Sequence, residues 1–115
     1  MVALVSGLVV LVRFPFSDLS SSKLRPAVAL AHAGGTDWVL CQVTSNPYGD
    51  PRAVAMTDSG FASESLRVAS YARPGKLFTA SGDLIVSTVG TLTGEAIRQV
   101  VDAVVAMLRG GLPRG

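Results

Sequence analysis

The stretch "RPAVALAHAGGTDWVLCQVTS", residues 25–45, decides how the chain folds. Two apolar runs, residues 25–33 and 37–45, flank Gly34, Gly35 and Thr36. Apolar runs on either side of a tight glycine turn are typical of a β-hairpin. The sequence therefore predicts two antiparallel strands, with the start of the first beside the end of the second.

Further strands are predicted at residues 8–14, 53–57, 66–71 and 84–91, because apolar runs there are separated by loops rich in proline and glycine, including Pro74 and Gly75. From Thr93, a predicted N-cap, the pattern changes to helical spacing, and Gly110 and Gly111 end the helix. Its apolar positions are Ile97, Val100, Val101, Val104 and Leu108, and its polar positions are Glu95, Arg98, Gln99, Asp102 and Arg109. We expect one domain, residues 1–115, of mainly β (α+β) class: a small, strongly bent antiparallel sheet or barrel with a C-terminal helix.

Composition limits the functional classes. The 115 residues are 49% hydrophobic and 16% charged, with a mean hydropathy of +0.45, more apolar than a small monomer needs, so a homodimer is expected. A net charge of +2 permits a nucleic-acid partner without requiring one. A single cysteine, Cys41, and a single histidine, His32, give little basis for a disulfide or a metal site, so we expect chemistry without metal or cofactor.

The apolar run at residues 1–13 is shorter than the roughly 20 residues of a membrane-spanning helix and has no basic residue before it. We therefore expect a cytoplasmic protein that has no membrane partner.

A serine-rich loop lies between the first two predicted strands, in "FPFSDLSSSKLRPAV", residues 14–28. Loops mounted on rigid strands often carry binding and catalytic groups, although a solvated turn is the simpler interpretation. The loop ends in a lysine and an arginine, Lys23 and Arg25, which makes it a candidate flap over an anion site.

Four segments together resemble the PemK/MazF family of toxins from bacterial toxin-antitoxin pairs, over about the whole chain. They are "GLVVLVRFPFSDLSSSKLRPAVAL" (7–30), "CQVTS" (41–45), "SLRVASYARPGKLFT" (65–79) and "VGTLTGEAIRQVVDAV" (89–104). The most specific element is the polar loop ending in K-x-RP, followed in order by "TS" at the end of the next strand. The resemblance implies an SH3-like barrel, a homodimer, and a metal-independent, sequence-selective endoribonuclease for single-stranded RNA (mRNA) that is held inactive by a cognate antitoxin.

By this resemblance Arg25 is the active-site arginine and Thr44 its hydroxyl partner. An arginine suits phosphate because its planar fork donates two hydrogen bonds and stays charged. Both residues are nearly equidistant from the Gly34–Gly35 turn, so the hairpin brings them together, although a slip of one residue would turn one of them away. Taken alone, Arg25 could be a surface arginine and Thr44 an ordinary strand threonine.

Other polar residues are candidates for binding RNA, each with a solvated or packing role as the alternative. The loop "SNPYGDPR" (45–52) is a candidate specificity loop, or a plain turn in which Asp50 and Arg52 form a weak exposed pair. Tyr48 or Tyr71 could stack on an unpaired base. The predicted substrate-binding set is Ser22, Lys23, Ser45, Asn46, Tyr48, Arg52 and Lys76, and Arg67 and Arg73 could extend the basic track.

Cys41, His32 and Trp38 are not assigned to the site, since alternation turns Cys41 to the other face and His32 lies at the far end of its strand. Two positions depart from the family pattern: Leu8, where an acidic residue is common, and Leu84 in "TASGDLI" (79–85), where an arginine is expected. Two alternative functions stay open, a toxin of the same barrel that poisons DNA gyrase and a former toxin that only binds antitoxin or RNA.

Overall fold

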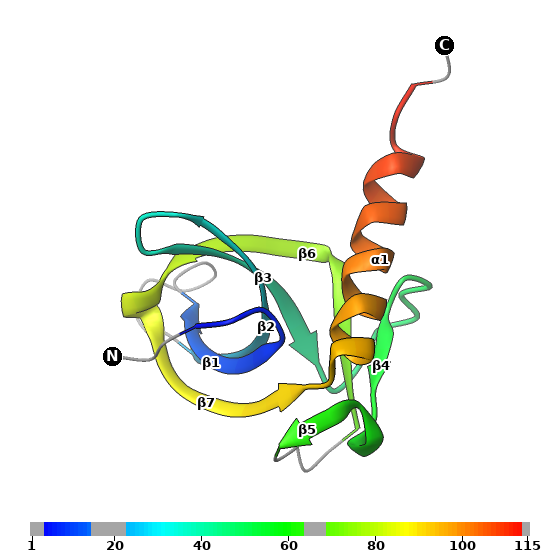
Figure 1. Ribbon diagram of the computed structural model, residues 1–115. Coiled ribbons are helices and arrows are strands. Elements are labelled where there is room, and N and C mark those ends of the chain that lie inside the picture. Colours follow the sequence, from blue (N-terminus) through cyan, green and yellow to red (C-terminus); the bar gives the residue numbers. More distant parts are fainter. Residues whose placement is uncertain (1–3, 15–22, 64–68, 114–115) are drawn as a thin grey trace.

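The computed structural model describes residues 4–14, 23–63 and 69–113, and within them seven strands form one antiparallel sheet followed by a helix. The elements are β1 (Leu8–Phe14), β2 (Lys23–Gly34), β3 (Asp37–Thr44), β4 (Val54–Met56), η1 (Asp58–Gly60), β5 (Phe61–Ser63), β6 (Ser70–Ser81), η2 (Gly82–Leu84), β7 (Ile85–Leu92) and α1 (Gly94–Gly110). The strand order is β4-β6-β3-β2-β1-β7-β5, and the sheet curls round on itself (Figure 1). The expected bent antiparallel sheet with one C-terminal helix is confirmed.

The predicted hairpin is present as β2 and β3. Its turn contains Gly34 at φ +120° and Gly35 at φ +56°, values that glycine adopts without the strain a side chain would add. The register pairs Ala27 with Gln42 and Val28 with Cys41. Because opposite residues in an antiparallel pair share a face, this register fixes which side chains meet on each side of the sheet.

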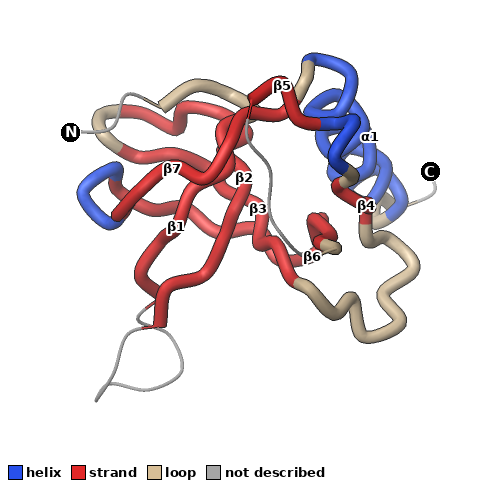
Figure 2. Tube along the Cα trace, turned by 90° about the horizontal axis from the view of Figure 1, so that it is seen from below, coloured by secondary structure: helices blue, strands red, loops and turns tan. Residues whose placement is uncertain are grey.

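The curled sheet has a separate apolar core on each face. Along β2, Val28 and Leu30 point to the side that also holds Val100 and Val104 of α1, whereas Ala27 and Ala29 point to the other side. Helix α1 packs against β6, β4 and β7, and Figure 2 shows it to one side of the strands. The face opposite to α1 is therefore filled by strand side chains, among them Val10, Val12, Leu40 and Ile85.

Strand β6 corrects the sequence prediction, which ended a strand at residue 71 and assigned Pro74 and Gly75 to a loop. The strand instead continues to Ser81, and the β3–β6 register shifts between Cys41 and Val43. This bulge accommodates Pro74, which cannot donate to the ladder and is fully buried. Residues 64–68, the start of the predicted strand, lie outside the described residues, and β5 was not predicted.

Helix α1 begins as predicted. The Thr93 side-chain oxygen accepts a hydrogen bond of 3.1 Å from the Ala96 N–H, which caps the first turn. Val100 and Val104 are buried, but Leu108, predicted to face the core, is 59% exposed. The prediction for Leu108 was wrong because the helix runs past the edge of the sheet, as Figure 1 shows.

Candidate functional site

Arg25 and Thr44 lie on the neighbouring strands β2 and β3, each two residues beyond the last β2–β3 pair. Arg25 is two residues before Ala27 and Thr44 is two residues after Gln42, and Ala27 and Gln42 are paired. Thr44 is itself paired with Tyr71 of β6. The β2–β3 pairing ends at Ala27 and Gln42, and its continuation by two residues would put Arg25 at the level of Thr44 and Tyr71.

Arg25 and Thr44 lie on the sheet face opposite to α1. Alternation along β2 puts Arg25 on the side of Ala27 and Ala29, and alternation along β3 puts Thr44 on the side of Leu40. The Arg25 side chain is exposed, and within the described residues it forms no ion pair. It presents a cation that is available to a phosphate.

The Thr44 hydroxyl is engaged with the chain that follows it. It donates to the Asn46 carbonyl oxygen at 3.0 Å and accepts from the Asn46 N–H at 3.1 Å. The Asn46 side-chain oxygen in turn accepts from the Tyr48 N–H at 2.9 Å. A hydroxyl has one proton, so Thr44 must release Asn46 before it can donate to a substrate, while its second lone pair remains free to accept. In this structure Thr44 fixes the start of the β3–β4 loop, residues 45–53, which is the long tan segment between β3 and β4 in Figure 2.

Asp50 organises the β3–β4 loop. Its carboxylate accepts from the Arg73 Nε at 3.1 Å and from the Arg52 backbone N–H at 2.9 Å. Its own N–H donates to the Pro47 carbonyl oxygen at 2.9 Å, and the Ala53 N–H donates to the Asp50 carbonyl oxygen at 3.2 Å. The Arg52 N–H and then the Arg73 guanidinium hold the pKa of Asp50 below its usual value. The weak Asp50–Arg52 pair of the plain-turn alternative is not formed: Asp50 is paired with Arg73, while Arg52 bonds to Asp50 through its backbone N–H and adds only a minor charge attraction.

Tyr48 is the most exposed large hydrophobic side chain of the described residues, with 74% of its surface accessible. Its φ of +54° is left-handed, which is uncommon for any residue with a side chain. The Arg73 Cζ lies 5.9 Å from the ring centroid, within the range of a cation–π contact. An aromatic ring held at an exposed position by a neighbouring guanidinium is a suitable surface for stacking.

The remaining predicted binding residues are scattered around this region. Ser45, Asn46, Arg52 and Lys76 are exposed, the first three on the β3–β4 loop and Lys76 on β6. Ser22 and Arg67 lie outside the described residues, as do the flap at 15–22 and the side chain of Lys23. The backbone of Lys23 lies at the start of β2, opposite Phe14.

The residues left out of the site lie away from it. Cys41 is fully buried on the α1 side, where its Sγ donates to the Arg73 carbonyl oxygen at 3.2 Å and burial raises its pKa to about 12. Exposed His32 contacts Trp38 edge-on near the hairpin turn, with ring centroids 5.7 Å apart. Two positions depart from the PemK/MazF pattern. Leu8 is buried in the core on the face opposite to α1, whereas Leu84 is 38% exposed in η2.

Sequence reasoning missed Gln42 and the part played by Asp50. Gln42 is half-buried, two residues before Thr44 on the same face, and its amide is available for a base edge or a phosphate. The alternation of "CQVTS" could have found it, because residues two apart on a strand share a face.

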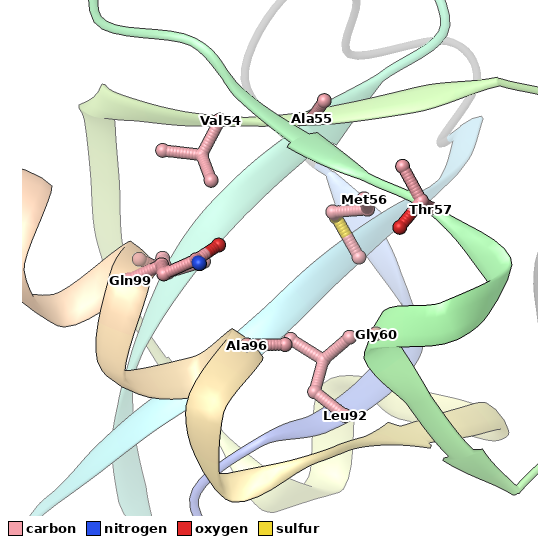
Figure 3. Close-up of a pocket in the computed structure, with 9 residues that line it drawn as sticks. Val54, Ala55, Met56, Thr57, Gly60, Leu92, Ala96 and Gln99 are labelled. Atoms are coloured by element: carbon pink, nitrogen blue, oxygen red, sulfur yellow. The ribbon is translucent and has the colours of Figure 1, made fainter.

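A small hollow of about 40 Å³ lies elsewhere, between β4 and α1 (Figure 3). Met56, Leu92 and Val100 form its apolar floor, and Thr57 and Gln99 stand at its sides. These core residues belong to the α1 face of the sheet, so the hollow is separate from Arg25. Its volume is too small for a nucleotide.

Among the residues that the structure describes, no three His, Cys, Asp or Glu side chains are grouped so that they could hold a metal ion. None of the helices described there is long and apolar enough to cross a membrane.

Comparison with known proteins identifies the fold. The structure matches an endoribonuclease in complex with its cognate antitoxin, from a mycobacterial species, with a TM-score of 0.71, 20% identity and 100% of both chains covered. The chain has the MazF fold. MazF from Deinococcus radiodurans matches with a TM-score of 0.70 and 18% identity, over 90% of this chain and 94% of that one. Mycobacterium tuberculosis toxin MazF-mt6 matches with a TM-score of 0.69 and 14% identity, over 89% of this chain and 96% of that one.

No protein-family model matches the sequence. No curated protein matches it either. At identities of 20% and below, a shared MazF fold establishes the architecture, and the chemistry depends on the side chains that this chain places on it.

Proposed function

We propose that this protein is the toxin of a toxin-antitoxin pair and a sequence-selective endoribonuclease that cuts single-stranded RNA, mRNA in particular, in the cytoplasm. The observation that carries the proposal is that the MazF fold of this chain turns Arg25 and Thr44, on the neighbouring strands β2 and β3, to the same face of the sheet. The gyrase-poisoning alternative gives these two residues no role, and the binding-only alternative gives them no role in cleavage.

RNA supplies its own nucleophile, so the protein needs to align atoms and stabilise charge. The 2′-oxygen attacks phosphorus, the bond from phosphorus to the 5′-oxygen breaks, the 2′-hydroxyl loses a proton and the leaving 5′-oxygen gains one. In this scheme the Arg25 guanidinium binds the phosphoryl oxygens and stabilises the charge that develops on them. Thr44 turns its proton from the Asn46 carbonyl oxygen to a phosphoryl oxygen when RNA binds, and it still accepts from the Asn46 N–H, which fixes the start of the β3–β4 loop. No metal ion takes part in the proposed reaction.

The other predicted residues form the substrate track. The proposed phosphate-binding residues are Ser45 and Asn46 on the β3–β4 loop, Lys76 on β6, and Ser22 and Lys23, whose side chains lie outside the described part of the chain. Arg52 lies further along the β3–β4 loop and contacts the RNA backbone. Arg73 is not included among the residues that bind the RNA backbone, because its guanidinium is already paired with Asp50 and lies against the ring of Tyr48.

A homodimer and an antitoxin complete the proposal. On the outer part of α1 and just beyond it, Val105, Leu108 and Leu112 are 40%, 59% and 63% exposed, which leaves an apolar stripe for a second copy to cover. The antitoxin partner is inferred from the mycobacterial endoribonuclease of the same fold that is in complex with its cognate antitoxin. An apolar or acidic antitoxin segment along the dimer groove would block the flap and so prevent RNA from reaching Arg25.

The test compares Arg25→Ala with a matched arginine variant on α1, Arg98→Ala, on a long single-stranded RNA. Arg98 is exposed and lies on the helix, away from the proposed site. Arg25→Ala is expected to lower the cleavage rate by about 100-fold or more, as does the loss of a comparable charge stabiliser, and Arg98→Ala is expected to cleave like the wild type. Arg25→Lys keeps the charge without the planar fork and should fall between them. Full cleavage by folded Arg25→Ala would overturn the assignment.

A further inference from the structure

Tyr48 and Gly49 are the central residues of a turn closed by the hydrogen bond of 2.9 Å from the Asp50 N–H to the Pro47 carbonyl oxygen, and this turn requires a positive φ at both of them. Non-glycine residues at a φ near +54° pay a conformational cost, and the next residue, Gly49 at φ +71°, shows what the chain uses where no side chain is needed. A large, 74% exposed ring is instead maintained there. Strain that local bonds hold in place is found most often at ligand sites.

Local bonds hold the ring in place from two sides. On one side, the Tyr48 N–H bonds to Asn46, which bonds to the Thr44 hydroxyl, so the loop is connected to the proposed cleavage site by two successive contacts. On the other side, Arg73 reaches from β6 to Asp50 at 3.1 Å and to the ring of Tyr48 at 5.9 Å. The side chains of Arg73 and Asp50 are only 20% and 14% exposed, so this pair is shielded better than an ordinary surface pair.

We propose that Tyr48 is the stacking surface for one unpaired base next to the cleaved bond, and that Arg73 and Asp50 are positioning residues that fix the ring. The guanidinium lies over the ring, and the large exposed area leaves the ring open to a base. Stacking accepts every base but is stronger for larger ones, so the surface favours a purine at that position. The inference rests on the proposed function for the identity of the ligand, single-stranded RNA.

The first test measures binding without cleavage. The probes are octa-adenylate and octa-uridylate made with 2′-O-methyl riboses, which cannot react through the 2′-oxygen. Tyr48→Gly removes the ring and relieves the strained φ, so folding is not at risk, and Tyr48→Phe keeps the ring. We expect wild type and Tyr48→Phe to bind octa-adenylate equally and more tightly than octa-uridylate, and Tyr48→Gly to bind it about 10-fold to 100-fold more weakly. Equal affinity of Tyr48→Gly and wild type, or no binding by wild type, would overturn the proposal.

A double-mutant cycle separates positioning from direct contact. Arg73→Gln breaks the ion pair and should weaken octa-adenylate binding in the wild-type background but not in the Tyr48→Gly background, because its effect passes through the ring. Arg73→Lys keeps a cation and should restore part of the affinity. An equal loss from Arg73→Gln in both backgrounds would mean that Arg73 contacts the RNA backbone itself, and the positioning role would be wrong.

The cleavage assay distinguishes this inference from the proposed function. Tyr48→Gly is expected to raise KM while kcat stays near the wild-type value, since the base lies beside the reacting atoms and not among them. If wild type fails to cut RNA but the octa-adenylate results hold, the proposed reaction fails and the stacking surface stands. If RNA is cut and Tyr48→Gly changes neither KM nor octa-adenylate affinity, the stacking surface fails and the proposed reaction stands.

Discussion

Helix α1 should depend on the core and not on its own helical propensity, and Val100→Ala tests this. Val100 is 1% exposed within the core on the α1 face. Removing two buried methyl groups costs about 1.6 kcal/mol of transfer free energy, and the cavity left behind adds about 1 kcal/mol. Alanine is a better helix former than valine and returns about 0.5 kcal/mol. The free energy of unfolding is therefore expected to fall by about 2 kcal/mol.

The matched control is Val105→Ala on the same helix, where the side chain is 40% exposed. Little burial is lost there in a single chain, so this variant should be neutral or slightly more stable below the protein concentration at which the proposed dimer forms. Urea unfolding at one fixed protein concentration measures both variants, with an unchanged m-value and a midpoint about 1 M lower for Val100→Ala. A Val100→Ala midpoint equal to that of wild type would refute the reasoning. A concentration-dependent loss for Val105→Ala would instead place the stripe in the dimer interface.

Three further predictions concern single contacts. Thr93→Ala removes the helix cap and should lower the free energy of unfolding by about 1 kcal/mol in the same urea assay, whereas Thr93→Ser should lower it little. Equal stability of wild type and both variants would contradict the cap. The pKa of Cys41 rises from 9.0 to about 12 on folding, so at pH 8 the native thiol should react with iodoacetamide on the order of 1,000-fold more slowly than the unfolded thiol. For the same reason the free energy of unfolding should fall as the pH rises from 9.0 toward 12. Rapid alkylation of the native protein would show that Cys41 is accessible. The pKa of Asp50 is lowered from 3.8, so its contribution to stability is complete above pH 3.8 and is lost as the pH falls through the lower folded value. An NMR titration of the Asp50 carboxyl carbon should show this lowered midpoint, and Arg73→Gln should move it only part of the way back because the Arg52 N–H remains; an unchanged midpoint in that variant would contradict the ion pair.

The hairpin and the start of the helix were predictable because short-range chemistry determines them. Gly34 and Gly35 mark a turn that few other residues can form, and Thr93 before a helical pattern marks a cap. Strand β6 was not predictable in this way. Pro74 usually ends a strand, and only the bulge opposite β3 allows the pairing to resume beyond it.

The site was predictable to the extent that it follows from hairpin register. The sequence indicates that Arg25 and Thr44 lie near the same end of the hairpin, but the register there also depends on two shifts, between Ala29 and Ala31 and between His32 and Gly34, which the glycine pair does not indicate. The contact between Asp50 and Arg73 could not be predicted, because 23 residues separate them and the bulge in β6 sets where Arg73 lies. The exposure of Leu108 was missed for a related reason, since periodicity gives the face of a helix but not where the sheet beneath it ends.

The most direct test of the central claim is the chemistry of the cut RNA ends. The purified protein is incubated with a long single-stranded RNA in excess EDTA, the cuts are mapped, and an oligonucleotide spanning one cut is made with a 2′-deoxyribose on the 5′ side of the broken bond. The proposal predicts cuts at a recurring short sequence, with 2′,3′-cyclic phosphate and 5′-hydroxyl ends, and an intact deoxy oligonucleotide. Cleavage that requires a divalent metal, or that proceeds equally on the deoxy oligonucleotide, would contradict a reaction through the 2′-oxygen, and RNA left intact would favour a toxin that acts by binding alone.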